Sequence, residues 1–143
     1  MIFFQAYINR GDVLIKMGKA NEAYKVYQEA LNFEPDNADL HYNLGVVLIE
    51  LGKPNEALEM FNNALQVDSE HLQSLMNSAI LMQESGIPNL RPLAYERLFK
   101  VSLRFPTFCH IFTLIVNSSK GVDSYKFHYE PKEIQYTLNH IGY

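Results

Sequence analysis

The chain has 143 residues, of which 48% are hydrophobic and 20% are charged, values typical of one folded globular domain. Its net charge is −4 and its 12 Lys and Arg residues form no cluster, which argues against nucleic acid as the main partner, because phosphate binding needs concentrated basic side chains. The single cysteine, Cys109, excludes a disulfide within the chain, and no apolar run approaches the about 20 residues of a membrane-spanning helix.

Asparagine recurs at positions 9, 43 and 77, and other residues recur with the same spacing of 34. The aligned sets are Gly11 with Gly45; Gly18 with Gly52 and Gly86; Ala23 with Ala57; Tyr27 with Phe61; and Ala30-Leu31 with Ala64-Leu65. This period, with small residues at these offsets, is typical of tetratricopeptide repeats, each of which is a helix–turn–helix unit. We therefore predict an all-α fold, a tetratricopeptide solenoid of about three helical hairpins followed by an atypical C-terminal tail.

The first repeat is predicted over residues 4–37. Its first helix should cover residues 5–17 and end at Gly18, because glycine adopts the left-handed conformation without steric cost. The second helix should be capped by Asn21, whose short polar side chain can accept a hydrogen bond from a free backbone N–H. The residues expected to face inward on the second helix are Ala23, Tyr27 and Ala30.

The second repeat is predicted over residues 38–71, with the same arrangement. Asn55 should cap its second helix. His41 replaces a large inward residue, and we expect it to be a core histidine. The residues expected to pack inward on the second helix are Ala57, Phe61, Ala64 and Leu65.

The third repeat, residues 72–106, contains a three-residue insertion around 87–92. Asn89 falls on the capping position of the earlier repeats. Three added residues rotate a helix by roughly 300°, which is only about 60° short of a full turn. The inward-facing residues therefore shift little, and we expect a second helix that is longer by one turn and still packs. Pro92 is compatible with the first turn of that helix.

No fourth repeat can be threaded through the tail, residues 107–143. The tail offers an apolar segment, 108–116, and a glycosylation sequon at Asn117. Because periodicity is lost just after 100–102, whose codons can read as a splice donor, we expect a tail that is either disordered or mistranslated. The proline at 106, where the shifted repeat requires one, argues for a genuine tail.

The three recurring asparagines occupy one place on the first helix of each repeat, on the face expected to line the concave groove of the solenoid. An asparagine amide can donate and accept hydrogen bonds at once, so a row of them can hold the backbone of an extended polypeptide. The alternative is that they recur only because the repeats are related. The predicted peptide-binding residues are Asn9, Asn43, Asn77, Gln5, Asp12, Tyr42 and Met76.

A second type of tetratricopeptide groove clamps the C-terminal carboxylate of chaperones with Lys, Arg and Asn side chains. The corresponding places here hold Ile8, Asp12, Asn43, Gln73 and Asn77. Only Asn43 fits that pattern, and no cation is present to pair with the carboxylate. The sequence therefore argues against a carboxylate clamp.

No pattern of catalytic, cofactor-binding or metal-binding residues is found in the sequence. The five histidines show no ligand spacing, and Cys109 has no neighbouring base that could activate it. We predict no catalytic residue, cofactor or metal in this chain.

The segment 77–86, followed by Leu90, Arg91, Pro92 and Ala94, resembles the transmembrane and tetratricopeptide repeat-containing (TMTC) family, including its enlarged turn before Leu-Arg-Pro. The resemblance covers roughly residues 5–100, and its distinctive part is about 20 residues long. It implies a parent protein in the endoplasmic reticulum membrane, with its repeats in the lumen, that is associated with O-mannosylation of cadherin-type domains. Catalysis in that family lies in a multi-spanning N-terminal region that nothing here matches.

The resemblance thus implies a lumenal, polypeptide-binding part of an O-mannosyltransferase, attached to the membrane only through a missing N-terminal region. Two alternatives stay open. One is an incomplete glycosyltransferase, and the other is a free-standing soluble adaptor or co-chaperone. All three interpretations have a polypeptide as the partner in the groove.

Overall fold

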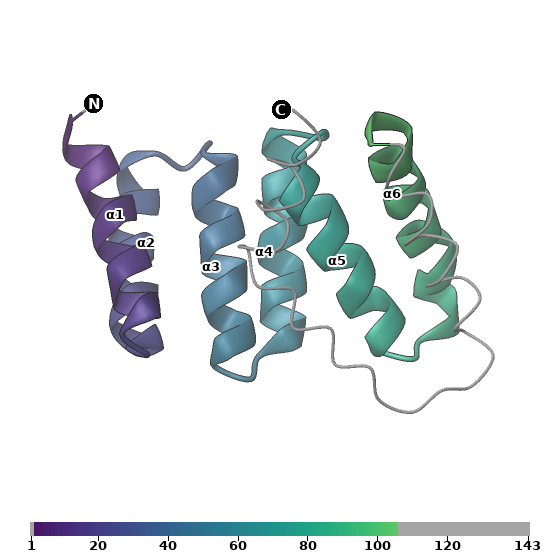
Figure 1. The fold of residues 1–143 in the computed structure, drawn as a ribbon, viewed down its shortest axis with the longest axis horizontal. Coiled ribbons are helices and arrows are strands. Elements are labelled where there is room, and N and C mark those ends of the chain that lie inside the picture. The colour runs from purple at the N-terminus through teal and green to yellow at the C-terminus, as the bar shows by residue number, and fades with distance from the viewer. Residues whose placement is uncertain (1, 106–143) are drawn as a thin grey trace. The chain divides into compact units, whose positions relative to one another are not determined.

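Six α-helices make up most of residues 2–105, the part of the chain that the computed structural model describes, with side chains from Gln5 onward (Figure 1). They are α1 (Ile2–Lys16), α2 (Ala20–Phe33), α3 (Ala38–Glu50), α4 (Pro54–Val67), α5 (Leu72–Glu84) and α6 (Arg91–Arg104). Each helix packs against the next one in the chain. The helices therefore form three successive hairpins, and the predicted all-α helical-hairpin fold is confirmed. The predicted tail lies outside the described residues.

A glycine in the left-handed conformation ends the first helix of each hairpin, as predicted at Gly18. Its φ is 72°, and φ is 73° at Gly52 and 66° at Gly86. In the first two hairpins the turn is closed in the same way. Lys19 N–H donates to the Leu14 carbonyl, and Lys53 N–H donates to the Leu48 carbonyl, both at 2.8 Å. These bonds satisfy carbonyl groups that the end of a helix leaves free.

The prediction that asparagines cap the second helices was wrong. The capping residues of α2, α4 and α6 are Lys19, Lys53 and Leu90, and none of them makes a side-chain capping bond. In the first two hairpins only one residue separates the left-handed glycine from the helix. Asn21 and Asn55 consequently lie inside the first turn, whereas Asn89 lies in a short 3₁₀ helix, η1 (Pro88–Leu90).

Side-chain caps occur instead at the start of α3 and α5. The side-chain oxygen Oδ1 of Asn37 accepts a hydrogen bond from Leu40 N–H at 3.1 Å. Nδ1 of His71 accepts one from Ser74 N–H at 3.3 Å. Both caps stand between hairpins, so they fix the point where one hairpin ends and the next begins.

Aromatic rings fill the interior of the first two hairpins. Tyr27 and Phe61 are fully buried. A Cβ atom built at Gly11 would lie 2.3 Å from the Tyr27 ring, and one built at Gly45 would lie 2.5 Å from the Phe61 ring. The small residues of the first helices thus make room for the large residues of the second helices. Also buried around these rings, as predicted, are Ala23, Ala30, Ala57 and Ala64.

The three-residue insertion lies in the turn of the third hairpin and does not lengthen its second helix. α6 has 14 residues, as do α2 and α4, so the predicted additional turn of helix is wrong. The extra residues form η1, which the sequence analysis did not separate from the helix. Pro92 lies in the first turn of α6, as expected, where its missing N–H leaves no carbonyl without a partner.

Candidate functional site

The three recurring asparagines lie at equivalent positions of α1, α3 and α5. Asn9 is exposed, and Asn43 and Asn77 are half-buried. The solvent-facing stripe of these three helices that carries them is called the asparagine face below. On the same stripe lie Gln5 of α1, which is exposed, and Val46 and Ile80, which are half-buried.

The three amides differ in how far the chain itself uses them. The side-chain amide nitrogen of Gln5 donates to the side-chain oxygen Oδ1 of Asn9 at 3.1 Å. The amide nitrogen of Asn77 donates to the Tyr42 hydroxyl at 3.5 Å, a long and weak bond. The Asn43 side chain makes no hydrogen bond to any residue in the described part of the chain. Asn43, and to a lesser degree Asn77, therefore keep their hydrogen-bonding capacity for another molecule.

Tyr42 connects the asparagine face to the core between the second and third hairpins. Its ring centroid lies 5.8 Å from that of Phe61 and 5.5 Å from that of His71. Burial raises the pKa of its hydroxyl, and the hydrogen bond from Asn77 acts in the opposite direction. The hydroxyl is thus held neutral beside Asn77.

Two other predicted site residues are used by the fold. The Tyr27 hydroxyl donates to the Asp12 carboxylate at 2.5 Å, joining α1 to α2. Burial raises the pKa of Tyr27 well above its usual range, and the hydrogen bond and charge of Asp12 raise it further. Met76 is only 4% exposed and belongs to the core, so its inclusion among the ligand contacts requires correction. Its neighbours Leu75 and Ala79 on α5 are buried as well.

His71 is the buried histidine of the described chain, at 8% exposure, and its burial was not predicted from the sequence. Since its Nδ1 accepts from Ser74 N–H, the proton is on Nε2, which donates to the Asp39 carboxylate at 3.0 Å. This bond joins the second hairpin to the third. A spacing signal was available, because His71 directly precedes a helix in the same way as Asn37.

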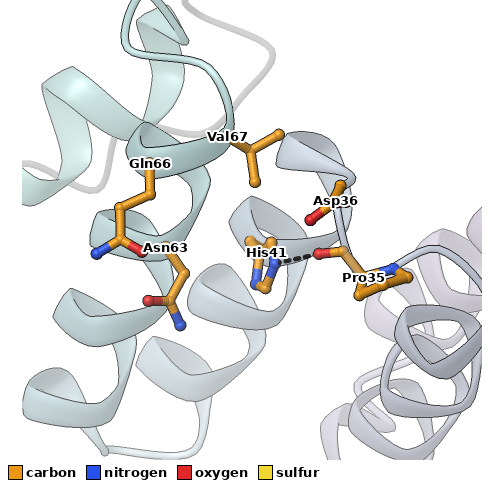
Figure 2. A pocket seen from close by; sticks show the side chains of 6 residues that line it. All are labelled: Pro35, Asp36, His41, Asn63, Gln66 and Val67. Atoms are coloured by element: carbon orange, nitrogen blue, oxygen red, sulfur yellow. Dashed lines mark hydrogen bonds between the residues drawn. The ribbon is translucent and has the colours of Figure 1, made fainter.

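His41, predicted to be a core histidine, instead lines a hollow of about 400 Å³ between the α2–α3 turn and α4 (Figure 2). Its Nε2 lies 2.8 Å from the Pro35 carbonyl oxygen, whereas its Nδ1 is buried without a hydrogen-bond partner in the described chain. The other lining residues are Asp36, Asn63, Gln66 and Val67.

Residues 2–105 contain neither a metal-binding group nor a membrane-spanning helix. No group of three or more His, Cys, Asp or Glu side chains there is arranged to hold a metal ion. None of the helices in this range combines the length and apolar character needed to cross a membrane. Cys109, the remaining histidines (His110, His128, His140) and the sequon at Asn117 lie outside the described residues.

Comparison with protein families identifies the class to which this fold belongs. A model described as a TPR repeat matches residues 11–52, and one described as a tetratricopeptide repeat matches residues 38–71. Together with the six-helix arrangement, these matches define residues 2–105 as an all-α tetratricopeptide solenoid.

Among curated proteins, the chain is similar to Protein O-mannosyl-transferase TMTC3. It is 54% identical to the Homo sapiens protein over 41 residues and 55% identical to the Mus musculus protein over 41 residues. The match covers 29% of this chain and 4% of each relative. The chain therefore spans a small fraction of the length of the curated relatives that it matches.

Solved structures share the fold at low sequence identity. The first TPR of Spaghetti (RPAP3) bound to HSP90 peptide SRMEEVD aligns with a TM-score of 0.71, at 17% identity, over 82% of this chain and 96% of that one. The second TPR domain of human RPAP3 in complex with HSP70 peptide SGPTIEEVD aligns with a TM-score of 0.65, at 20% identity, over 77% of this chain and 92% of that one. MamA aligns with a TM-score of 0.64, at 19% identity, over 75% of this chain and 61% of that one.

Proposed function

We propose that the described solenoid is a protein-interaction module that binds an extended polypeptide through the asparagine face. The availability of the Asn43 amide carries this proposal, since a polar side chain with free donor and acceptor groups stands at the middle of the row. Solved chains of the same fold are bound to peptides, which supports a polypeptide as the ligand. The stacking of repeats also provides an extended surface suited to such a ligand.

The chemistry of the face suits recognition of a peptide backbone. Each asparagine amide can donate to a backbone carbonyl and accept from a backbone N–H of the same ligand. Between the amides, the half-buried side chains of Val46 and Ile80 offer apolar contact for the ligand's side chains. The contacts proposed for the ligand are made by Asn9, Asn43, Asn77, Gln5 and Tyr42, whereas Asp12 acts through its bond to Tyr27.

The proposal predicts that Asn43→Ala combined with Asn77→Ala weakens peptide binding and leaves the melting temperature unchanged. Peptides selected from a displayed random 12-residue library against the whole chain serve as probes, and binding is measured by fluorescence anisotropy. Loss of two hydrogen bonds of about 1 kcal/mol each should weaken binding by about tenfold or more. The fold should be unaffected because neither amide has a strong partner within the described chain.

The matched control is Asn63→Ala with Gln66→Ala, which removes two amides from the hollow beside His41. This control should bind the selected peptides as tightly as the unmodified chain does. If affinity is unchanged in the Asn43 and Asn77 double variant, the asparagine face is not the binding surface.

We further propose that this module belongs to a TMTC-like O-mannosyltransferase of the endoplasmic reticulum and presents cadherin-type substrates. The 54% identity to the human relative and the sequence around Leu90, Arg91 and Pro92 support this origin. The alternative is a free-standing soluble adaptor or co-chaperone. Sequencing of the full-length transcript distinguishes the two origins. Codons for membrane-spanning segments upstream of Met1 would support the O-mannosyltransferase, and their absence from that transcript would support the adaptor.

A further inference from the structure

A second row of residues runs parallel to the asparagines. Lys16, Glu50 and Glu84 each follow an asparagine by seven residues, and two turns bring residue i+7 to about the same side of a helix as residue i. All three are exposed and end their helices, α1, α3 and α5. At a rise of about 1.5 Å per residue, this row lies roughly 10 Å from the asparagines along each helix.

The free charges of this row are mostly negative. Neither Glu50 nor Glu84 forms an ion pair or a hydrogen bond through its carboxylate with the described residues. Lys53, the cation next in sequence to Glu50, is held by Glu56 at 3.1 Å. Within the described chain, Lys16 is the only cation of the two rows, and it stands one repeat away from Glu50.

The two glutamates also occupy places that are unfavourable for the stability of their own helices. The C-terminus of a helix carries a partial negative charge, so a cation is stabilising there and a carboxylate is not. α1 follows this rule with Lys16 in its last turn, whereas α3 and α5 have no basic residue there. The carboxylates of Glu50 and Glu84 each add to the negative electrostatic potential at the end of their helix. The combined negative potential there attracts cations.

We propose that the polypeptide bound by the asparagine face carries Lys or Arg side chains, which pair with Glu50 and Glu84. This inference rests on the proposed function and specifies the ligand. The backbone would lie along Asn43 and Asn77, and a long basic side chain would extend along the helix to the carboxylate row. Peptides as acidic as SRMEEVD, which the solved relative binds, would be repelled, because carboxylates face carboxylates here.

The test selects peptides from a displayed random 12-residue library against three forms of the whole chain. The forms are the unmodified protein, Glu50→Gln with Glu84→Gln, and the control Glu29→Gln with Glu59→Gln. The control removes the same charge from exposed glutamates of α2 and α4 that have no ion pair in the described chain. The unmodified protein and the control should enrich Lys- and Arg-containing peptides, and the first variant should lose this enrichment.

For a selected basic peptide, affinity should fall about tenfold in Glu50→Gln/Glu84→Gln and stay constant in the control. The melting temperature of the first variant should stay the same or rise, which a merely structural role for the carboxylates would not produce. Selected peptides without a preference for Lys and Arg would overturn the inference. An equal loss of affinity in the control variant would overturn it too. Either result would leave polypeptide binding itself standing. A failure to select any peptide would contradict the proposed function, and the inference with it.

Discussion

The absence of a side chain at Gly45 allows Phe61 to pack directly against α3. A Cβ atom at this position would lie 2.5 Å from the ring, well inside normal contact distance. Glycine in a helix otherwise costs about 1 kcal/mol relative to alanine, so Gly→Ala should stabilise a helix wherever there is space. Whether Gly45→Ala raises or lowers the free energy of unfolding therefore indicates whether the Phe61 ring leaves space for a methyl group.

We predict that Gly45→Ala lowers the free energy of unfolding by about 1–3 kcal/mol, because the methyl group overpacks a dense core. Urea unfolding followed by circular dichroism measures this. The third hairpin suggests a rescue, since Ala79 and Leu98 occupy the places of Gly45 and Phe61 there and both are buried. Gly45→Ala combined with Phe61→Leu should regain part of the loss. A single variant as stable as the unmodified chain would contradict the packing account.

Individual residues show where prediction from sequence succeeds. Gly18, Tyr27 and Phe61 were assigned correctly because their roles depend on neighbours at fixed sequence offsets within one hairpin. His41 and His71 could not be told apart, because burial of a histidine depends on contacts between hairpins. The burial of Met76, which was predicted to contact the ligand, was missed for the same reason.

At the scale of the helices, α6 differs from α2 and α4 on its outer side. Alignment on Ala23, Ala57 and Ala94 places Phe99 where the earlier helices carry Gln28 and Asn62. It likewise places Leu103 where they carry Asn32 and Gln66. Phe99 is 53% exposed and Leu103 is 68% exposed. These two large apolar side chains lie one turn apart and form an exposed hydrophobic patch on the last described helix, which favours association with another molecule.

We predict that Phe99→Asn combined with Leu103→Gln reduces self-association of the whole chain, because these residues restore the polar character of the earlier helices. Sedimentation velocity over a range of concentrations measures the effect. The free energy of unfolding should change by only about 0.5 kcal/mol, since exposed side chains contribute little to the core. Val13→Asn combined with Met17→Gln, at exposed positions in α1 and in the turn directly after it, controls for a general loss of apolar surface. Equal effects of the two pairs would refute a specific role for α6.

The helix boundaries show a second limit of sequence reasoning. The lengths of α2 and α4 follow from the repeat, but the insertion before α6 was assigned to the helix and not to the turn. Pro88 and Pro92 both permit helical starts, so sequence alone did not decide where the helix begins. Likewise, Asn21 and Asn55 carry a strong capping side chain, but the glycine turn before them starts the helix earlier.

At the scale of the whole molecule, the fold and the binding role rest on different grounds. The fold follows from small residues that recur at 34 and from the large residues they accommodate, so the sequence was sufficient to predict it. The ligand depends on side chains that point to solvent and do not affect folding. At 17–20% identity the solved relatives establish the fold alone, so the asparagine face needs its own test.

The most direct test of polypeptide binding at the asparagine face is a nuclear magnetic resonance titration of the whole chain with a library-selected peptide. The side-chain amide signals of Asn43 and Asn77 are followed together with those of Asn63 and Gln66, which line the hollow beside His41. The proposed function predicts that the first pair shifts on binding and the second pair does not. Shifts confined to Asn63 and Gln66 would move the binding site to the hollow and contradict the account.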